Sequence, residues 1–155
     1  ALYAGNAGSL LFIAIVFSLL AVIAILSIRK SLPHSTPYAL TIMALVLTFF
    51  LGIICFMANP LERLPVTPAD GQGINPLLVH FGMFIHPPVQ MTGLVSVSIP
   101  FSIAIGAMLA KRGGRDEWVD IGRIWGMISW LILTMGLLLG SWWAYTLLGR
   151  GVSWA

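Results

Sequence analysis

Long apolar runs alternate along the chain with short polar connections, the pattern of a helical protein that crosses a membrane repeatedly. Four of these runs reach roughly 20 residues, the length that a helix rising about 1.5 Å per residue needs to cross about 30 Å of hydrocarbon. We therefore expect an all-α polytopic membrane protein with about four transmembrane helices, near residues 9–29, 38–58, 89–110 and 124–148. Pro100 lies inside the third run, where a membrane helix tolerates proline as a kink.

The longest connection, residues 59–88, contains an apolar stretch of its own. Residues 76–85 read PLLVHFGMFI, which is too short to span a bilayer. Asn75 is a suitable N-cap for a helix, and Pro76 suits the first helical position. We expect a short interfacial helix in this outer loop, lying on the membrane surface.

Composition excludes an ordinary soluble domain. The chain is 59% hydrophobic and 8% charged, whereas soluble domains carry about a quarter charged residues. The net charge of +3 would indicate nucleic-acid binding only if the basic residues formed a face, and they lie instead at the ends of apolar runs. We expect no nucleic-acid partner. Cys55 is the single cysteine, so the chain has no intrachain disulfide and no cysteine-based metal cluster.

The distribution of basic residues predicts the orientation in the membrane. Two of the eight lie in the long loop and the C-terminal tail, at Arg63 and Arg150. The others lie in or beside the first and third connections, which the positive-inside rule places in the cytoplasm: Arg29, Lys30, Lys111, Arg112, Arg115 and Arg123. Both ends of this segment and the loop 59–88 then face the periplasm or its equivalent.

Three histidines are the candidates for chemistry. His34 lies in a turn between prolines and reads as a solvated turn residue. His80 falls in the expected interfacial helix, and His86 precedes the pair Pro87–Pro88. Six positions at about 100° per residue leave His80 and His86 roughly 120° apart. The two therefore do not share a helix face, and a joint metal site is not expected.

His86 is the more informative of the two. The following proline favours an extended backbone at His86, and a rigid, neutral imidazole in apolar and aromatic surroundings suits an axial haem ligand. A histidine that merely caps the third helix is the alternative, which composition alone favours. The adjacent Trp142 and Trp143 point to different helix faces. One of them should face a protein or ligand surface, and a flat aromatic shelf would suit a large planar ligand.

Five segments spread over essentially the whole chain resemble one family. They read GSLL at 8–11, NPLERL at 59–64, DGQGINPLL at 70–78, GMFIHPP at 82–88 and GLLLGSWWAY at 136–145. In this order and spacing they are similar to the CcmF/NrfE family of cytochrome c-type biogenesis proteins, membrane haem lyase components. The chain begins at Ala1 and ends at Ala155, and we expect residues 1–155 to be a single transmembrane segment of a larger protein in this family.

The resemblance implies a site and an activity. His86 would be an axial ligand of the haem iron, with Trp142, Trp143 and Trp154 forming part of the aromatic shelf. The implied function is cytochrome c maturation in the bacterial inner membrane, by periplasm-facing binding of haem b and its ligation to apocytochrome c as haem c. The implied partners are a haem chaperone, apocytochrome c and other maturation subunits, besides the lipid bilayer. The family's tryptophan-rich signature is altered here, because Arg150 and Ser153 replace two tryptophans.

Two other functions remain open on the sequence. A haem-export or chaperone-handover protein would bind haem without ligation chemistry. A membrane permease or structural subunit would use the tryptophans only as an interfacial belt. The apolar cores of the spans contain no charged residue, which argues against an ion or proton pathway in this segment.

Overall fold

The computed structural model describes residues 5–62, 69–70, 73, 79–111 and 115–148, and every regular element in this part of the chain is a helix. The elements are α1 (Asn6–Ile28), α2 (Thr36–Phe56), α3 (Phe81–Ser96), α4 (Ser98–Ala110) and α5 (Arg115–Leu148). Because α3 and α4 form one run, the described residues contain four helical segments long and apolar enough to cross a membrane. The expected all-α polytopic fold is confirmed.

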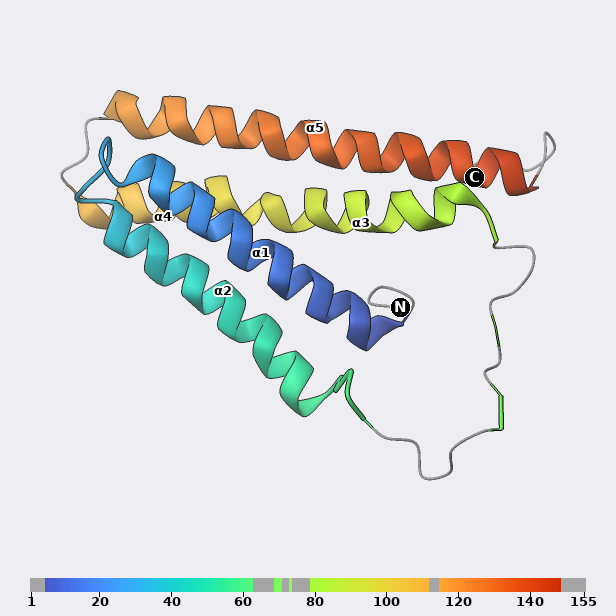
Figure 1. The fold of residues 1–155 in the computed structure, drawn as a ribbon. Coiled ribbons are helices and arrows are strands. Elements are labelled where there is room, and N and C mark those ends of the chain that lie inside the picture. The colour runs from blue at the N-terminus through green and yellow to red at the C-terminus, as the bar shows by residue number, and fades with distance from the viewer. Residues whose placement is uncertain (1–4, 63–68, 71–72, 74–78, 112–114, 149–155) are drawn as a thin grey trace.

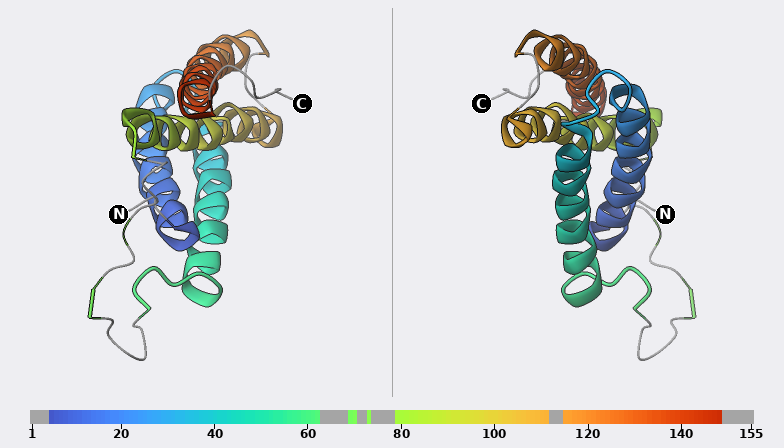
Figure 2. Two further views of the ribbon diagram at one scale, coloured as in Figure 1. Left: turned by 90° about the vertical axis from the view of Figure 1, so that its right-hand side faces the viewer. Right: turned by 90° about the vertical axis from the view of Figure 1, so that its left-hand side faces the viewer.

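The helices are arranged around the α3–α4 run. α5 lies along one side of this run and contacts both of its halves, while α1 and α2 form a hairpin on the other side (Figures 1 and 2). The α1–α2 connection lies at the same end of the bundle as the end of α4 and the beginning of α5 (Figure 1). The beginnings of α1 and α3 and the ends of α2 and α5 lie toward the opposite end.

Small residues bring the helices into contact. A Cβ atom added to Gly93 of α3 would lie 2.5 Å from Leu133 Cα of α5, and one added to Gly106 of α4 would lie 2.6 Å from the Ala39 nitrogen of α2. Lipid tails are as apolar as leucine, so membrane helices associate through such close approach rather than by burying apolar surface from water. Large side chains such as Leu138, which is 64% exposed, lie on the outside, where lipid would surround them.

The interruption between α3 and α4 follows from Pro100. Proline lacks the N–H that would bond the carbonyl of residue i−4, here Ser96, the last residue of α3. Val97 between the two helices keeps right-handed helical angles, with φ −60° and ψ −26°. The chain therefore continues in nearly the same direction, and the effect of Pro100 is an interruption of the helix and not a marked kink (Figure 1).

Two expectations about the third span are wrong. The span begins at Phe81 and not near residue 89, and residues 81–85, expected in a separate interfacial helix, form the first turn of α3. His86 is helical and not extended, and the helix continues through Pro87 and Pro88. The preference of a residue before proline is weak enough for tertiary packing to override, and α3 is packed closely on α5 here. Residues 74–78, the rest of the expected interfacial helix, lie outside the described residues.

α5 also begins about nine residues earlier than expected, at Arg115.

Candidate functional site

His86 lies in the interface between α3 and α5. Its Nδ1 is 2.8 Å from the carbonyl oxygen of Gly136, fifty residues away in sequence. A carbonyl oxygen only accepts hydrogen bonds, so Nδ1 carries the proton and donates it. In the neutral imidazole the lone pair then resides on Nε2. Nε2 is therefore the nitrogen of His86 that could bind a metal.

Two glycines of α5 make room for this histidine. A Cβ atom at Gly140 would lie 2.5 Å from His86 Cε1, 2.8 Å from its Nδ1 and 3.1 Å from its Nε2. A Cβ atom at Gly136 would lie 2.5 Å from Oε1 of Gln90, one turn below His86 on α3. Gly136 and Gly140 are four residues apart and share one face of α5. Together they form a slot in the helix surface into which His86 and Gln90 fit.

Trp143 packs against the imidazole of His86. The ring centroids of His86 and Trp143 are 5.9 Å apart, with 37° between the ring planes. Gly82 of α3 allows this contact, since a Cβ atom there would lie 2.7 Å from Trp143 Cβ. The indole Nε1 is buried and has no hydrogen-bond partner. Trp143 is thus the tryptophan of the adjacent pair that faces protein, as expected for one of the two, whereas Trp142 is 45% exposed.

His80 has a different role, which the sequence analysis did not assign to it. It is the N-cap of α3, with φ −146° and ψ 149°, and its Nδ1 accepts the backbone N–H of Gly82 at 3.0 Å. The lone pair of Nδ1 is therefore engaged, and in the neutral ring Nε2 carries the proton. The ring lies 5.2 Å from that of Trp142, tilted by 55°. The sequence left open that His86 caps the third helix, and the residue that caps this helix is His80.

The predicted site residues are only partly brought together. His86 contacts Trp143, while Trp142 pairs with His80. Trp154 lies outside the described residues. His34 is exposed in the turn before α2, at the opposite end of the bundle. Among the described residues, no group of three His, Cys, Asp or Glu side chains could hold a metal ion.

Sequence reasoning missed the glycine slot and Gln90. The spacing of small residues in GLLLG, residues 136–140, was an available signal, because glycines four apart are typical of close contacts between membrane helices. It identifies a face of α5 but not the helix that packs there. Gln90 gave no signal of its own, and its importance comes from the burial of Oε1 without a hydrogen-bond partner.

Comparison with known proteins finds a family and several relatives. The model of the family described as cytochrome C assembly protein matches residues 3–155. The chain is 42% identical over 118 residues to the cytochrome c-type biogenesis protein CcmF of Pseudomonas aeruginosa, which covers 74% of this chain and 18% of that protein. It is 35% identical over 155 residues to the cytochrome c-type biogenesis protein NrfE of Haemophilus influenzae, covering 99% of this chain and 24% of that protein.

The Escherichia coli protein CcmF is similar at 40% identity over 116 residues, covering 74% of this chain and 18% of that protein. The chain thus spans about a fifth of the length of the curated relatives it matches. No solved structure matches the chain significantly.

Proposed function

The chain belongs to the family of cytochrome c assembly proteins, and on this premise we propose that it is the part of a haem lyase component that binds haem at the periplasmic face. The whole protein would act in cytochrome c maturation by ligating haem b to apocytochrome c. Haem is the substrate in this proposal, and its vinyl groups would receive the two cysteine thiols of the apocytochrome. The observation that carries the proposal is the hydrogen bond from His86 Nδ1 to the Gly136 carbonyl.

This hydrogen bond is what an iron-binding histidine requires. Histidines that bind metals almost always donate their other ring N–H to a carboxylate, a backbone carbonyl or water, which fixes the ring and raises the basicity of the ligating nitrogen. His86 has such a partner, so Nε2 is its basic nitrogen. His80 does not fit the role, because the nitrogen that holds its lone pair accepts the cap bond of α3.

The aromatic residues support the same site. Trp143 packs against the imidazole of His86 and backs it from the outer end of α5. Trp142, next to it in sequence, leaves 45% of its surface exposed and offers a flat face near the same end of the bundle. We propose that Trp142, Trp143 and Trp154 bind the haem plane, since aromatic rings contribute large apolar contact areas.

The charge distribution supports a periplasmic position for this site. The exposed Arg29 and Lys30 lie between α1 and α2, and Lys111 caps α4 at the same end of the bundle. By the positive-inside rule this end faces the cytoplasm. His86 lies near the beginning of α3, toward the opposite end. The protein would then be a multi-pass protein of the bacterial inner membrane, with both ends of this segment in the periplasm. A haem chaperone, apocytochrome c and other maturation subunits would meet it there.

The test is a count of haem per chain in the full parent protein. Wild type, His86→Ala and the control His34→Ala are purified from haem-replete cells, and haem is measured as pyridine haemochrome with and without imidazole. We expect His86→Ala to lose a haem fraction that imidazole restores, because free imidazole can occupy the vacated ligand position. His34→Ala should match wild type. Equal haem and identical spectra in all three proteins would overturn the proposal.

The chemical state of the haem after the reaction distinguishes a protein that ligates haem from one that only hands it over. With apocytochrome c added, a haem lyase component yields thioether-linked haem that stays with the polypeptide on denaturing gels. A protein that only hands haem over leaves it extractable, and this result would replace ligation by handover while keeping His86 as the ligand.

A further inference from the structure

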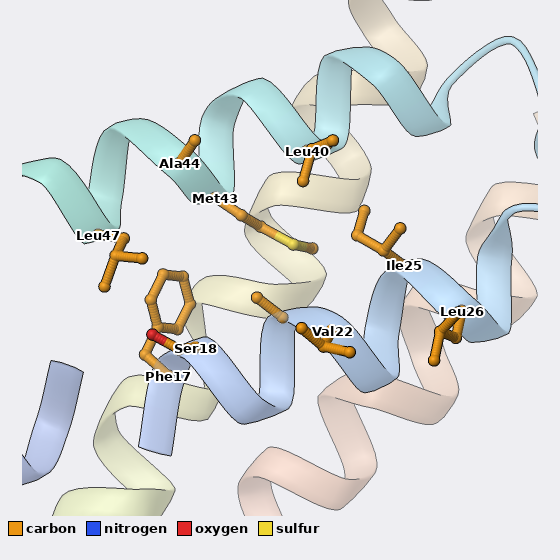
Figure 3. A pocket seen from close by; sticks show the side chains of 10 residues that line it. Phe17, Ser18, Val22, Ile25, Leu26, Leu40, Met43, Ala44 and Leu47 are labelled. Carbon is orange, nitrogen blue, oxygen red and sulfur yellow. The ribbon is translucent and has the colours of Figure 1, made fainter. Parts of the chain in front are cut away.

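A groove between α1 and α2 lies apart from the histidine site. Its volume is about 320 Å³, within the range of small-molecule binding sites. Its side chains come from facing positions of the two helices, with Val22 and Leu26 on α1 and Leu40 on α2 at its outer rim (Figure 3). The hydroxyl of Ser18 in its wall is already bonded to the Ala14 carbonyl at 2.7 Å. The groove therefore offers only apolar surface to an occupant.

The length of the groove indicates what it holds. It runs from Phe17 to Leu26 along α1, and nine residues at about 1.5 Å each make roughly 14 Å. This is about half of the roughly 30 Å hydrocarbon thickness, or one leaflet. The fully buried ring of Phe17 lies between the helices at the far end of the groove, beside Leu47 (Figure 3). An acyl chain of one leaflet matches this length.

Positive charge lies beyond the end of the groove that is nearer to the α1–α2 connection. Arg29, the C-cap of α1, follows the groove residue Ile25 by four residues and lies one turn beyond it on the same helix face. Lys30 comes next in the connection to α2. Both residues are exposed. Residues 5–58, which include α1, α2 and their connection, contain no Asp or Glu. The hairpin itself therefore offers these two cations no carboxylate partner.

We propose that the α1–α2 groove binds an anionic phospholipid, with one acyl chain between the helices and the phosphate headgroup at Arg29 and Lys30. Basic pockets between membrane helices on the cytoplasmic side attract anionic headgroups, because the cations lie at headgroup depth. The site is independent of His86 and of any role in haem binding.

The test is lipid retention by the full parent protein, measured by native mass spectrometry after incubation with equal amounts of phosphatidylglycerol and phosphatidylethanolamine of the same chain length. We expect phosphatidylglycerol to be retained preferentially. The double variant R29Q/K30Q should weaken its binding by about 30-fold, since each cation near the surface contributes roughly a factor of five. The control K111Q/R123Q removes two exposed cations of the same end from α4 and α5 and should leave the preference unchanged.

A second pair of variants tests the acyl chain. Ala44 lines the groove and Leu45, its neighbour, is 60% exposed and does not line it. Ala44→Phe fills the groove and should reduce retention of phosphatidylglycerol, whereas Leu45→Phe should not. Equal retention of the two lipids would overturn the proposal. So would equal effects of the two charge variants, or no effect of Ala44→Phe, the result expected if a protein segment covers the groove.

Discussion

Replacing Gly140 by alanine is the most direct perturbation of the histidine slot. The added Cβ atom would lie 2.5 Å from His86 Cε1 and 2.8 Å from its Nδ1, closer than side-chain atoms pack. The imidazole must therefore move away from α5, and its hydrogen bond to the Gly136 carbonyl must lengthen or break. Gly126 on the same helix has nothing within 4 Å of an added Cβ, which makes Gly126→Ala a matched control.

The expected cost follows from three contributions to the free energy of unfolding. Overpacking costs about 1–3 kcal/mol, and an interhelical hydrogen bond in a membrane contributes about 0.6 kcal/mol. Replacing a glycine inside a helix by alanine returns about 0.5–1 kcal/mol. We expect Gly140→Ala to lower the free energy of unfolding by about 1–3 kcal/mol. The Gly126→Ala control should leave it unchanged or raise it by up to about 1 kcal/mol.

The assay is a double-mutant cycle, followed by tryptophan fluorescence during unfolding in mixed micelles. Wild type, His86→Ala, Gly140→Ala and the double variant are compared. Because His86→Ala removes the ring that the new methyl group meets, Gly140→Ala should cost almost nothing in that background. A cost of Gly140→Ala that is the same with and without the imidazole would refute the contact. So would an equal cost for Gly126→Ala.

Two further predictions concern single side chains. Nitrogen-15 NMR of histidine-labelled protein should show His86 protonated on Nδ1 and His80 on Nε2 when both rings are neutral, and finding one tautomer for both would contradict the hydrogen bonds. Gln90→Met should raise the free energy of unfolding by about 1 kcal/mol, because it removes a buried amide oxygen without a partner. A loss of stability would instead reveal a partner for this amide in the membrane.

The spans were predictable because their signal is local. A run of about 20 apolar residues indicates a crossing whatever it packs against, and the expected beginnings of α1 and α2 lie within three residues of Asn6 and Thr36. The beginning of α3 was not predictable in this way. The residue before a proline prefers extended backbone, but this preference yields to the packing of α3 on α5 and to the cap provided by His80.

The site was predictable only in part, for a similar reason. The histidine–proline segment made His86 a candidate, and the adjacency of Trp142 and Trp143 predicted that one of them faces a protein or ligand surface. Which one does so depends on the rotation of α5 about its axis, and that rotation is set by contacts with α3. The acceptor of the His86 hydrogen bond is a backbone carbonyl fifty residues away. Every residue has a backbone carbonyl, so no sequence pattern could have predicted which one accepts this hydrogen bond.

In the proposed haem site, these contacts would fix the ligating nitrogen of His86 from two helices at once. His80 determines where α3 begins, and six residues later, on the same helix, His86 reaches α5. The Gly136 carbonyl then selects the tautomer, and the missing side chain of Gly140 sets how deep the ring lies. A ligand held in this way would need little reordering on binding iron, in contrast to a histidine on the long loop. For this reason we place the part of the proposed haem site that His86 supplies in the α3–α5 interface, and this part should survive changes in the loop that leave these two helices intact.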